Sequence, residues 1–183
     1  MASKAQESYA YKPLIGSRDI RLVTLRPGTG EQEISLTMAH ISLDGHPAYD
    51  ALSYVWGPQY PSYRVSCDEA FLEIGENLRD ALRYLRKPRA TRVLWVDRIA
   101  INQEDLEERA VQVELMADIY SSASEVPVWL GTADGNTDLA FRCIDDLARK
   151  MLAFWKSEAL LQRPWFSRVW TFQEIVLART PVL

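Results

Sequence analysis

Several residue patterns that would identify a chemistry are missing from this chain. Its eight glycines form neither GxGxxG nor GxxxxGK[ST], so both common phosphate-binding loops are absent. No GxSxG sequence is present, and with it the nucleophile elbow of α/β-hydrolases is missing. The two histidines, His40 and His46, both lie early in the chain. A Ser-His-Asp triad or a histidine-based metal site would have to recruit one of them across the fold, and we expect no metal.

Cysteines, basic clusters and long apolar runs are also scarce. Cys67 and Cys143 are far apart and form no CxxC pair, so we expect small core residues rather than ligands. With no signal peptide, a cytoplasmic protein with reduced thiols is predicted. No apolar run approaches the roughly 18 residues of a spanning helix. The net charge is −4 and no window concentrates Lys and Arg, which argues against nucleic acid or an anionic membrane as partner.

The residues that are present predict one folded domain. A length of 183 residues with 48% hydrophobic residues and six Trp is enough to bury a substantial core. Residues 1–12 are polar and small, and we expect a flexible arm. Alternating apolar and polar residues predict a hairpin over 20–25 and 34–41, and a second over 64–67 and 71–74.

From residue 49 onward, strand and helix patterns alternate, which predicts an α/β fold with a mainly parallel sheet flanked by helices. The N-terminal hairpins would be additions to that core. The expected strands are 49–56, 93–96, 125–131 and the start of one near 180–183, and the expected helices are 77–87, 105–120, 137–155 and 167–178.

Local signals set several expectations within these elements. Asn77 is predicted to cap its helix, and Asp105 with Glu108 resembles a capping box. Val111 is expected in the core stripe of the 105–120 helix. Pro127 is unfavourable inside a strand, so the strand is either at an edge or begins at this residue.

An apolar segment in the middle of the chain leads directly into a cluster of polar groups. Residues 93–96 have strong β preference, and Asp97 follows where open α/β sheets place ligand-binding residues. Asn102 and Gln103 continue the polar loop. Two interpretations stay open: the rim of a binding cleft, or a strand-to-helix turn in which Asp97 caps backbone amides.

Glu174 is the only charged residue between Val169 and Ala178. If this helix packs by both faces, apolar surroundings would raise the pKa of the carboxyl and suit it to acid/base or electrostatic work. Trp170 lies four residues earlier, hence on the same face. The alternative is that Glu174 forms an ordinary surface ion pair with a neighbouring arginine, or faces water.

Four sequence blocks together resemble the HET (heterokaryon incompatibility) domain of filamentous fungi. They are 49–57 (YDALSYVWG), 94–103 (LWVDRIAINQ), 108–113 (ERAVQV) and 163–174 (RPWFSRVWTFQE). The family usually has Asp-Ala-x-Cys-Ile-Asn-Gln in the second block, where this chain has Arg98 and Ala100. A role that depends on that cysteine is therefore excluded here.

A more distant resemblance is to Toll/interleukin-receptor-type (TIR) domains, and it implies a TIR-like, flavodoxin-like sheet. Residues 49–54 are similar to the Tyr-Asp-x-x-x-Ser-Tyr of the first TIR strand, with a gap one residue shorter. Residues 170–175 are similar to Trp-Cys-x-x-Glu-Leu, whose Glu is catalytic in NAD-cleaving TIR domains. We thus expect one HET domain over 13–183, with a TIR-like core over 49–183 that is cut short at its C-terminus.

The resemblance implies a role in fungal non-self recognition and programmed cell death, with NAD as substrate and no bound cofactor. Glu174 would be the catalytic residue of an NAD glycohydrolase (NADase). Residues expected to bind the substrate lie at the strand ends and on the last helix. They are Ser53, Tyr54, Trp56, Gly57, Asp97, Arg98, Asn102, Gln103 and Trp170. The alternatives are a non-enzymatic signalling module that self-associates or binds a partner, for example through the 105–120 helix, and a purely structural domain.

Overall fold

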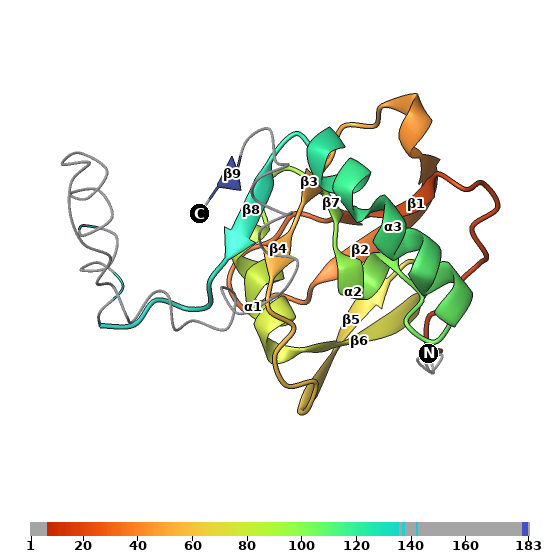
Figure 1. The fold of residues 1–183 in the computed structure, drawn as a ribbon. Helices are drawn as coiled ribbons and strands as arrows, with labels where there is room; N and C mark the ends of the chain where they lie inside the picture. Colours follow the sequence, from red (N-terminus) through yellow and green to blue (C-terminus); the bar gives the residue numbers. More distant parts are fainter. Residues whose placement is uncertain (1–6, 136, 138–141, 143–180, 183) are drawn as a thin grey trace.

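The fold is an α/β arrangement of two sheets and three helices within residues 7–135, 137, 142 and 181–182, the part described by this computed structural model (Figure 1). Its α-helices are α1 (Glu76–Leu85), α2 (Asp97–Ala100) and α3 (Leu106–Ser122), with a short 3-10 helix at Leu43–Gly45. Its strands are β1 (Asp19–Leu25), β2 (Ser35–Ser42), β3 (Asp50–Ala51), β4 (Ser53–Tyr54), β5 (Ser62–Cys67), β6 (Ala70–Gly75), β7 (Arg92–Trp95), β8 (Val126–Trp129) and β9 (Pro181–Val182).

One extended segment, residues 50–54, connects the two sheets. Its first half, β3, pairs in parallel with β7, and its second half, β4, pairs in parallel with β8. Between the halves, the amide of Leu52 donates to the carbonyl of Trp95 at 2.9 Å. Because β8 also pairs in parallel with β9, the spatial order is β7, β3/β4, β8, β9. The predicted alternation of strands and helices thus does produce parallel neighbours.

The larger sheet is mixed, which corrects the prediction of a mainly parallel sheet. Its order is β3-β7-β1-β2-β5-β6, and β1–β2, β1–β7 and β5–β6 are antiparallel pairs. Both predicted hairpins are confirmed, but the first is no separate addition. Strand β1 pairs with the edge of β7 that faces away from β3, so the hairpins extend the same sheet.

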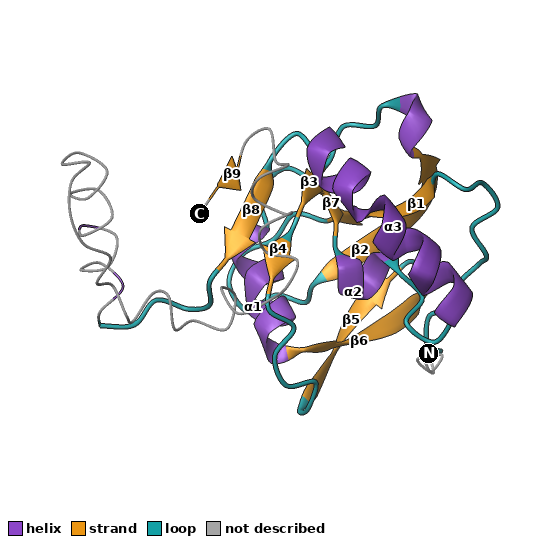
Figure 2. Ribbon diagram, in the orientation of Figure 1, coloured by secondary structure: helices purple, strands orange, loops and turns teal. Residues whose placement is uncertain are grey.

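Helices cover both faces of this sheet, as the alternation of side chains in β1 requires (Figure 2). Val23 and Leu25 belong to one apolar cluster together with the buried residues of α1. Ile20 and Leu22 point the other way, into a second cluster with the buried residues of α3. Sheet and helices therefore form the layered α/β core that the pattern from residue 49 predicts.

Three details at the helices differ from the expectations. The N-cap of α1 is Gly75, so the prediction that Asn77 caps this helix is wrong. Asp105 does cap α3, accepting from the amides of residues 107 and 108, but Glu108 binds elsewhere and completes no capping box. Val111 is 43% exposed. The neighbouring Gln112 is buried instead. Its side-chain amide donates to the carbonyl of Asp19 at 2.9 Å, which satisfies this polar group inside the fold.

The second half of the predicted flexible arm contacts the folded core. The amide of Tyr9 donates to the carbonyl of Phe71 at 2.8 Å, and the hydroxyl of Tyr11 donates to the carbonyl of Ile99 at 2.9 Å. Cys67 is buried, as predicted for a small core residue. Within the described residues, none of the helices has the length and apolar character needed to cross a bilayer. Cys143 and the helices predicted over 137–155 and 167–178 lie outside the described residues.

Candidate functional site

Three neighbouring strands, β7, β3/β4 and β8, end at one edge of the parallel part of the fold. The segments that follow them are 96–103, 55–60 and 130–132. In open α/β sheets, ligands bind outside the carboxyl ends of the strands, where side chains from separate loops meet. A binding site is therefore expected at this edge.

Asp97 ties the ends of β7 and β4 together. It is only 6% exposed, and one carboxylate oxygen accepts from the indole nitrogen of Trp56 at 2.8 Å. The other oxygen accepts from the backbone amide of Arg98 at 2.7 Å. The side-chain amide of Gln103 donates to the backbone carbonyl of Asp97 at 3.0 Å. Asp97 thus holds together the loop that sequence reasoning placed at the rim.

Arg98 lies against the loop that follows β4. Its Nε donates to Oε1 of Gln59 at 3.3 Å, and its guanidinium carbon lies 5.7 Å from the centroid of the Trp56 ring. Gln59 in turn donates to the carbonyls of Trp56 and Gly57, at 3.3 and 3.1 Å. Sequence reasoning did not identify Gln59, because no local pattern marks a loop glutamine as a contact of another loop.

Two glycines at this edge have a backbone conformation that other residues rarely adopt. Gly57, after β4, has a φ of 64°, and Gly131, after β8, has a φ of 100°. A side chain at either position would strain the backbone. Both turns therefore require glycine where the chain leaves a parallel strand.

Asn77 joins the ends of β4 and β8 from the first turn of α1. Its side-chain nitrogen donates to the carbonyl of Val55 at 2.6 Å, and its side-chain oxygen accepts from the indole nitrogen of Trp129 at 2.8 Å. This clamp occupies both ends of the amide, which explains why Asn77 does not cap the helix. The positions of Trp129 and Asn77 in the sequence give no sign that they meet.

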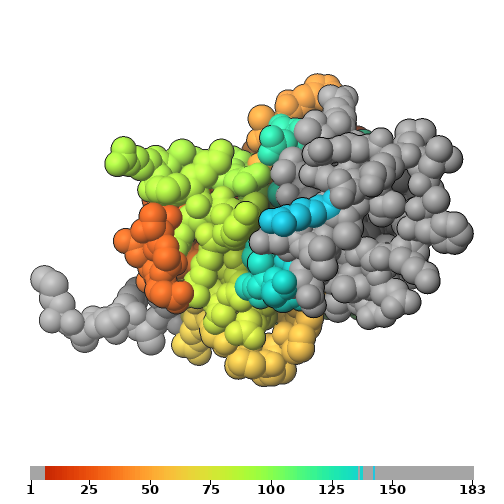
Figure 3. Space-filling view, turned by 90° about the vertical axis from the view of Figure 1, so that its left-hand side faces the viewer, coloured from red at the N-terminus to blue at the C-terminus, as the bar shows by residue number. Residues whose placement is uncertain are grey.

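A cavity of about 530 Å³ opens beside this clamp. It is lined by the loop after β4, the start of α1 and the turn after β8, and these segments meet on one face of the molecule (Figure 3). The lining residues are Pro58, Tyr60, Glu76, Asn77, Asp80, Gly131 and Thr132.

A larger cavity of about 920 Å³ lies elsewhere, between residues 7–12, the outer edge of β2 and the β5–β6 turn. Among the described residues, neither cavity is lined by a predicted site residue. We favour the smaller cavity as the functional one, because it lies where the loops after two neighbouring parallel strands, β4 and β8, meet the start of α1.

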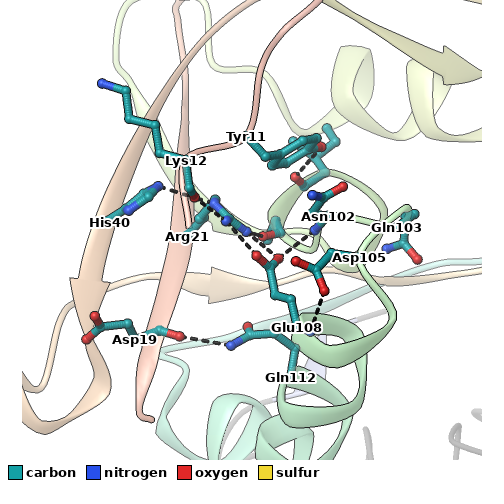
Figure 4. A network of polar contacts seen from close by, with 12 residues as sticks. Tyr11, Lys12, Asp19, Arg21, His40, Asn102, Gln103, Asp105, Glu108 and Gln112 are labelled. Atoms are coloured by element: carbon teal, nitrogen blue, oxygen red, sulfur yellow. Dashed lines mark hydrogen bonds and ion pairs between the residues drawn. The ribbon is translucent and has the colours of Figure 1, made fainter. Parts of the chain in front are cut away.

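A buried ion pair positions the polar loop that contains Asn102 (Figure 4). The guanidinium of Arg21 binds the carboxylate of Glu108 and also donates to the carbonyl of Ala100 at 3.0 Å. Glu108 accepts from the backbone amide of Asn102 at 2.7 Å. Burial alone would raise the pKa of Glu108, but the hydrogen bonds from Arg21 and from this amide leave the pKa below its usual range.

Tyr11 closes this network on the other side. Burial raises the pKa of its hydroxyl to about 12, although the charges of Arg98 and Arg21 act in the opposite direction. The phenol therefore stays neutral and donates to the carbonyl of Ile99. In the sequence, the signal that could have indicated this network is an arginine, Arg21, within the otherwise apolar segment 20–25.

The structure thus assembles only part of the predicted set. Trp56, Gly57, Asp97, Arg98 and Gln103 meet around one loop. Asn102 binds Glu108 through its backbone amide, and its side-chain oxygen accepts from the amide of Glu104 at 3.2 Å. Ser53 and Tyr54 are buried in β4, and none of the described members of the predicted set lines the cavity itself. Trp170 and Glu174 lie outside the described residues.

The described side chains at this edge can contact a ligand through several kinds of group. The described residues contain no group of three or more His, Cys, Asp or Glu placed to hold a metal ion. They supply an aromatic ring, an arginine, amide side chains and a buried carboxylate. Such a set is suited to a ligand that has both a planar ring and polar or anionic groups.

Comparison with known proteins gives a consistent result. Residues 49–174 match the family model of the heterokaryon incompatibility protein (HET). The heterokaryon incompatibility protein 6, OR allele, of Neurospora crassa is 37% identical over 152 residues, which is 74% of this chain. The match covers 22% of that relative, so the chain spans a small part of its length. No solved structure shows a significant match to the chain.

Proposed function

Because the chain belongs to the heterokaryon incompatibility (HET) family, we propose that it acts in fungal non-self recognition as an effector domain that triggers cell death. The name of the Neurospora crassa relative supports this role. We also propose that residues 13–183 form one HET domain. The pairing of β1 with β7 supports that boundary, since it places the first hairpin in the same sheet as the family-matched residues.

We propose NAD cleavage as the chemistry of this domain. The bond between C1′ of the ribose and the nicotinamide nitrogen breaks, and the electron pair leaves with nicotinamide. A water oxygen forms the new bond to C1′ and loses a proton, so that NAD and water give ADP-ribose, nicotinamide and a proton. Glu174, the last residue of the family match, would stabilise the oxocarbenium-like centre.

One observation carries this proposal: Trp56 and Asp97 join two strand ends beside a cavity large enough for a small ligand. The order β7, β3/β4, β8, β9 also supports a TIR-like core. If these four strands are numbered by their position in the chain, their order in space is 2-1-3-4, which is how the flavodoxin-like order begins. The substrate would lie along this edge, with Trp170 as a stacking wall and the buried Ser53 and Tyr54 supporting it from below.

The test is an NAD assay on the chain and on Glu174→Gln, with nicotinamide release as the readout. We expect release by the unmodified chain and a loss of at least about 100-fold in the variant, as for removal of a principal electrostatic group. Glu69→Gln, an exposed change in the β5–β6 turn, is the matched control and should release nicotinamide at the original rate. Undiminished release by Glu174→Gln would refute the assignment of Glu174.

A second candidate function is a non-enzymatic module that acts by self-association. Leu106 is 66% exposed and Val113 is 36% exposed, and their spacing of seven places them on one face of α3. Gel filtration over a concentration series, run beside the NAD assay, distinguishes the two functions. Oligomers that Leu106→Asp disrupts, with no nicotinamide release at any concentration, would favour the module. Val111→Asp, an exposed change on another face of α3, is the control.

A further inference from the structure

Arg98 is a cation that contacts the loop after β4, part of which lines the candidate cavity, and it has no carboxylate partner among the described residues. Its guanidinium makes one hydrogen bond there, from Nε to Gln59. The carboxylate of the adjacent Asp97 is instead occupied by the Trp56 indole and by the backbone amide of Arg98. An arginine in a partly buried site is usually paired with an acid or reserved for an anionic ligand.

The guanidinium is held in a defined orientation. Gln59 fixes its Nε, and the ring of Trp56 lies 5.7 Å from its central carbon. Both neighbours are themselves fixed, Gln59 by two backbone carbonyls and Trp56 by Asp97. The two terminal nitrogens make no hydrogen bond to the described residues, and together they form the planar fork that binds phosphate oxygens in pairs.

The other arginine near the cavity is already committed. Arg79 pairs with Glu76 at 3.1 Å and with Asp80 at 2.8 Å, the two acids that line the cavity. Its pairing offsets their charge and leaves it little capacity for a ligand. Gln59, which holds Arg98, lies between the lining residues Pro58 and Tyr60. Arg98 is thus placed to contact an anion bound at this loop.

We propose that Arg98 binds the phosphate groups of the ligand and makes the site selective for phosphate-bearing nucleotides. This inference rests on the proposed function, in which the ligand is NAD. It assigns the diphosphate of NAD to the Arg98 side of the loop after β4. The ring-bearing end of the ligand would then extend toward the cavity.

The experiment compares Arg98→Gln and Arg98→Lys with the unmodified chain by calorimetric titration at low ionic strength, where anion binding is least screened. The probes are inorganic pyrophosphate, NAD, and nicotinamide riboside, which has no phosphate. Arg98→Gln should weaken pyrophosphate and NAD binding about 10-fold to 100-fold, as for loss of charge-assisted hydrogen bonds. It should change nicotinamide riboside binding less than about twofold. Arg98→Lys keeps the charge without the fork, and should lose affinity to an intermediate extent.

Arg89→Gln is the matched control, because Arg89 is exposed in the loop before β7, at the opposite end of that strand. It should bind all three probes like the unmodified chain. Absence of pyrophosphate binding, unchanged binding by Arg98→Gln, or an equal loss for nicotinamide riboside would each overturn the inference. Binding of NAD that depends on Arg98 without nicotinamide release would support the inference and refute NAD cleavage. Nicotinamide release that does not depend on Arg98 would support NAD cleavage and refute the inference about Arg98.

Discussion

The carboxylate of Glu108 in α3 binds the guanidinium of Arg21 in β1 through two hydrogen bonds, of 2.5 and 2.8 Å. The side chains are 9% and 0% exposed. A charged pair this deeply buried depends on its partners, because an isolated charge in the same place is costly to desolvate. Since Glu108 also binds the amide of Asn102, the pair fixes the loop that follows α2.

Removal of one member of this pair should be strongly destabilising. We expect Glu108→Ala to lower the free energy of unfolding by about 3–5 kcal/mol, because the buried charge of Arg21 is left uncompensated. Urea unfolding followed by circular dichroism measures the change. The double variant Arg21→Met with Glu108→Leu should be more stable than Glu108→Ala. Glu107→Ala, an exposed change on the same helix, should cost less than about 0.5 kcal/mol, and a similar small cost for Glu108→Ala would contradict the prediction.

His40 should make stability fall as the pH falls. Partial burial and the charge of Arg21 lower the pKa of its imidazole, while Asp19 and Glu108 oppose this to a smaller extent. Neutral His40 accepts a hydrogen bond at Nε2 from Nε of Arg21, at 3.2 Å, and the imidazolium cannot. Because the folded pKa lies below the unfolded value of about 6.5, the unfolded chain binds the proton first. Stability is therefore complete above that value and declines below it, down to the folded pKa.

The measurement is the free energy of unfolding from pH 7.5 to 5 for the chain and for His40→Gln, which keeps an acceptor but does not titrate. One proton gives at most about 1.4 kcal/mol per pH unit, and the exposure of His40 should keep the effect well below that. The slope should decrease in His40→Gln and persist in His46→Gln. An unchanged slope in His40→Gln would contradict the prediction.

Much of the fold follows from local periodicity. Alternation in 20–25 and 34–41 sets the first hairpin, and the helical spacing of Leu78, Ala81, Leu82 and Leu85 sets the buried face of α1. The side of β7 on which the hairpin docks could not be inferred. That choice depends on which strand edge is left open once β3 has paired, a relation between distant residues.

The site was predictable to the extent that strand ends mark it. Asp97 and Trp56 follow apolar strands, and the structure places them in contact. Gln59 and Asn77 could not be found in this way, because each acts on a partner from another segment of the chain. Polar residues at loops and helix starts usually have local roles, so a long-range contact overrides the local expectation.

The Trp56–Asp97 hydrogen bond should couple the two loops energetically. Trp56→Phe removes the donor and leaves a buried carboxylate oxygen without that partner, so we expect a loss of about 1–3 kcal/mol in unfolding free energy. Asp97→Ala should cost a similar amount. Because the two changes remove one shared interaction, the double variant should fall short of the sum by at least about 0.5 kcal/mol. Strict additivity of the two losses would show that the contact contributes nothing.

The sign of the stability change caused by Asn77→Asp distinguishes a clamp from a helix cap. An acid in the first turn of α1 would gain about 0.3–1 kcal/mol from the helix dipole, so a capping role predicts that Asn77→Asp is neutral or stabilising. The clamp predicts the opposite, because a carboxylate cannot donate to the carbonyl of Val55 and would repel it at 2.6 Å. We expect a loss of about 1–3 kcal/mol, measured by urea unfolding. Asn77→Ser is a second test. Serine caps helices well but is too short to join Val55 to Trp129, so the clamp predicts that this variant is also destabilised. Stability equal to that of the unmodified chain in both variants would restore the capping role.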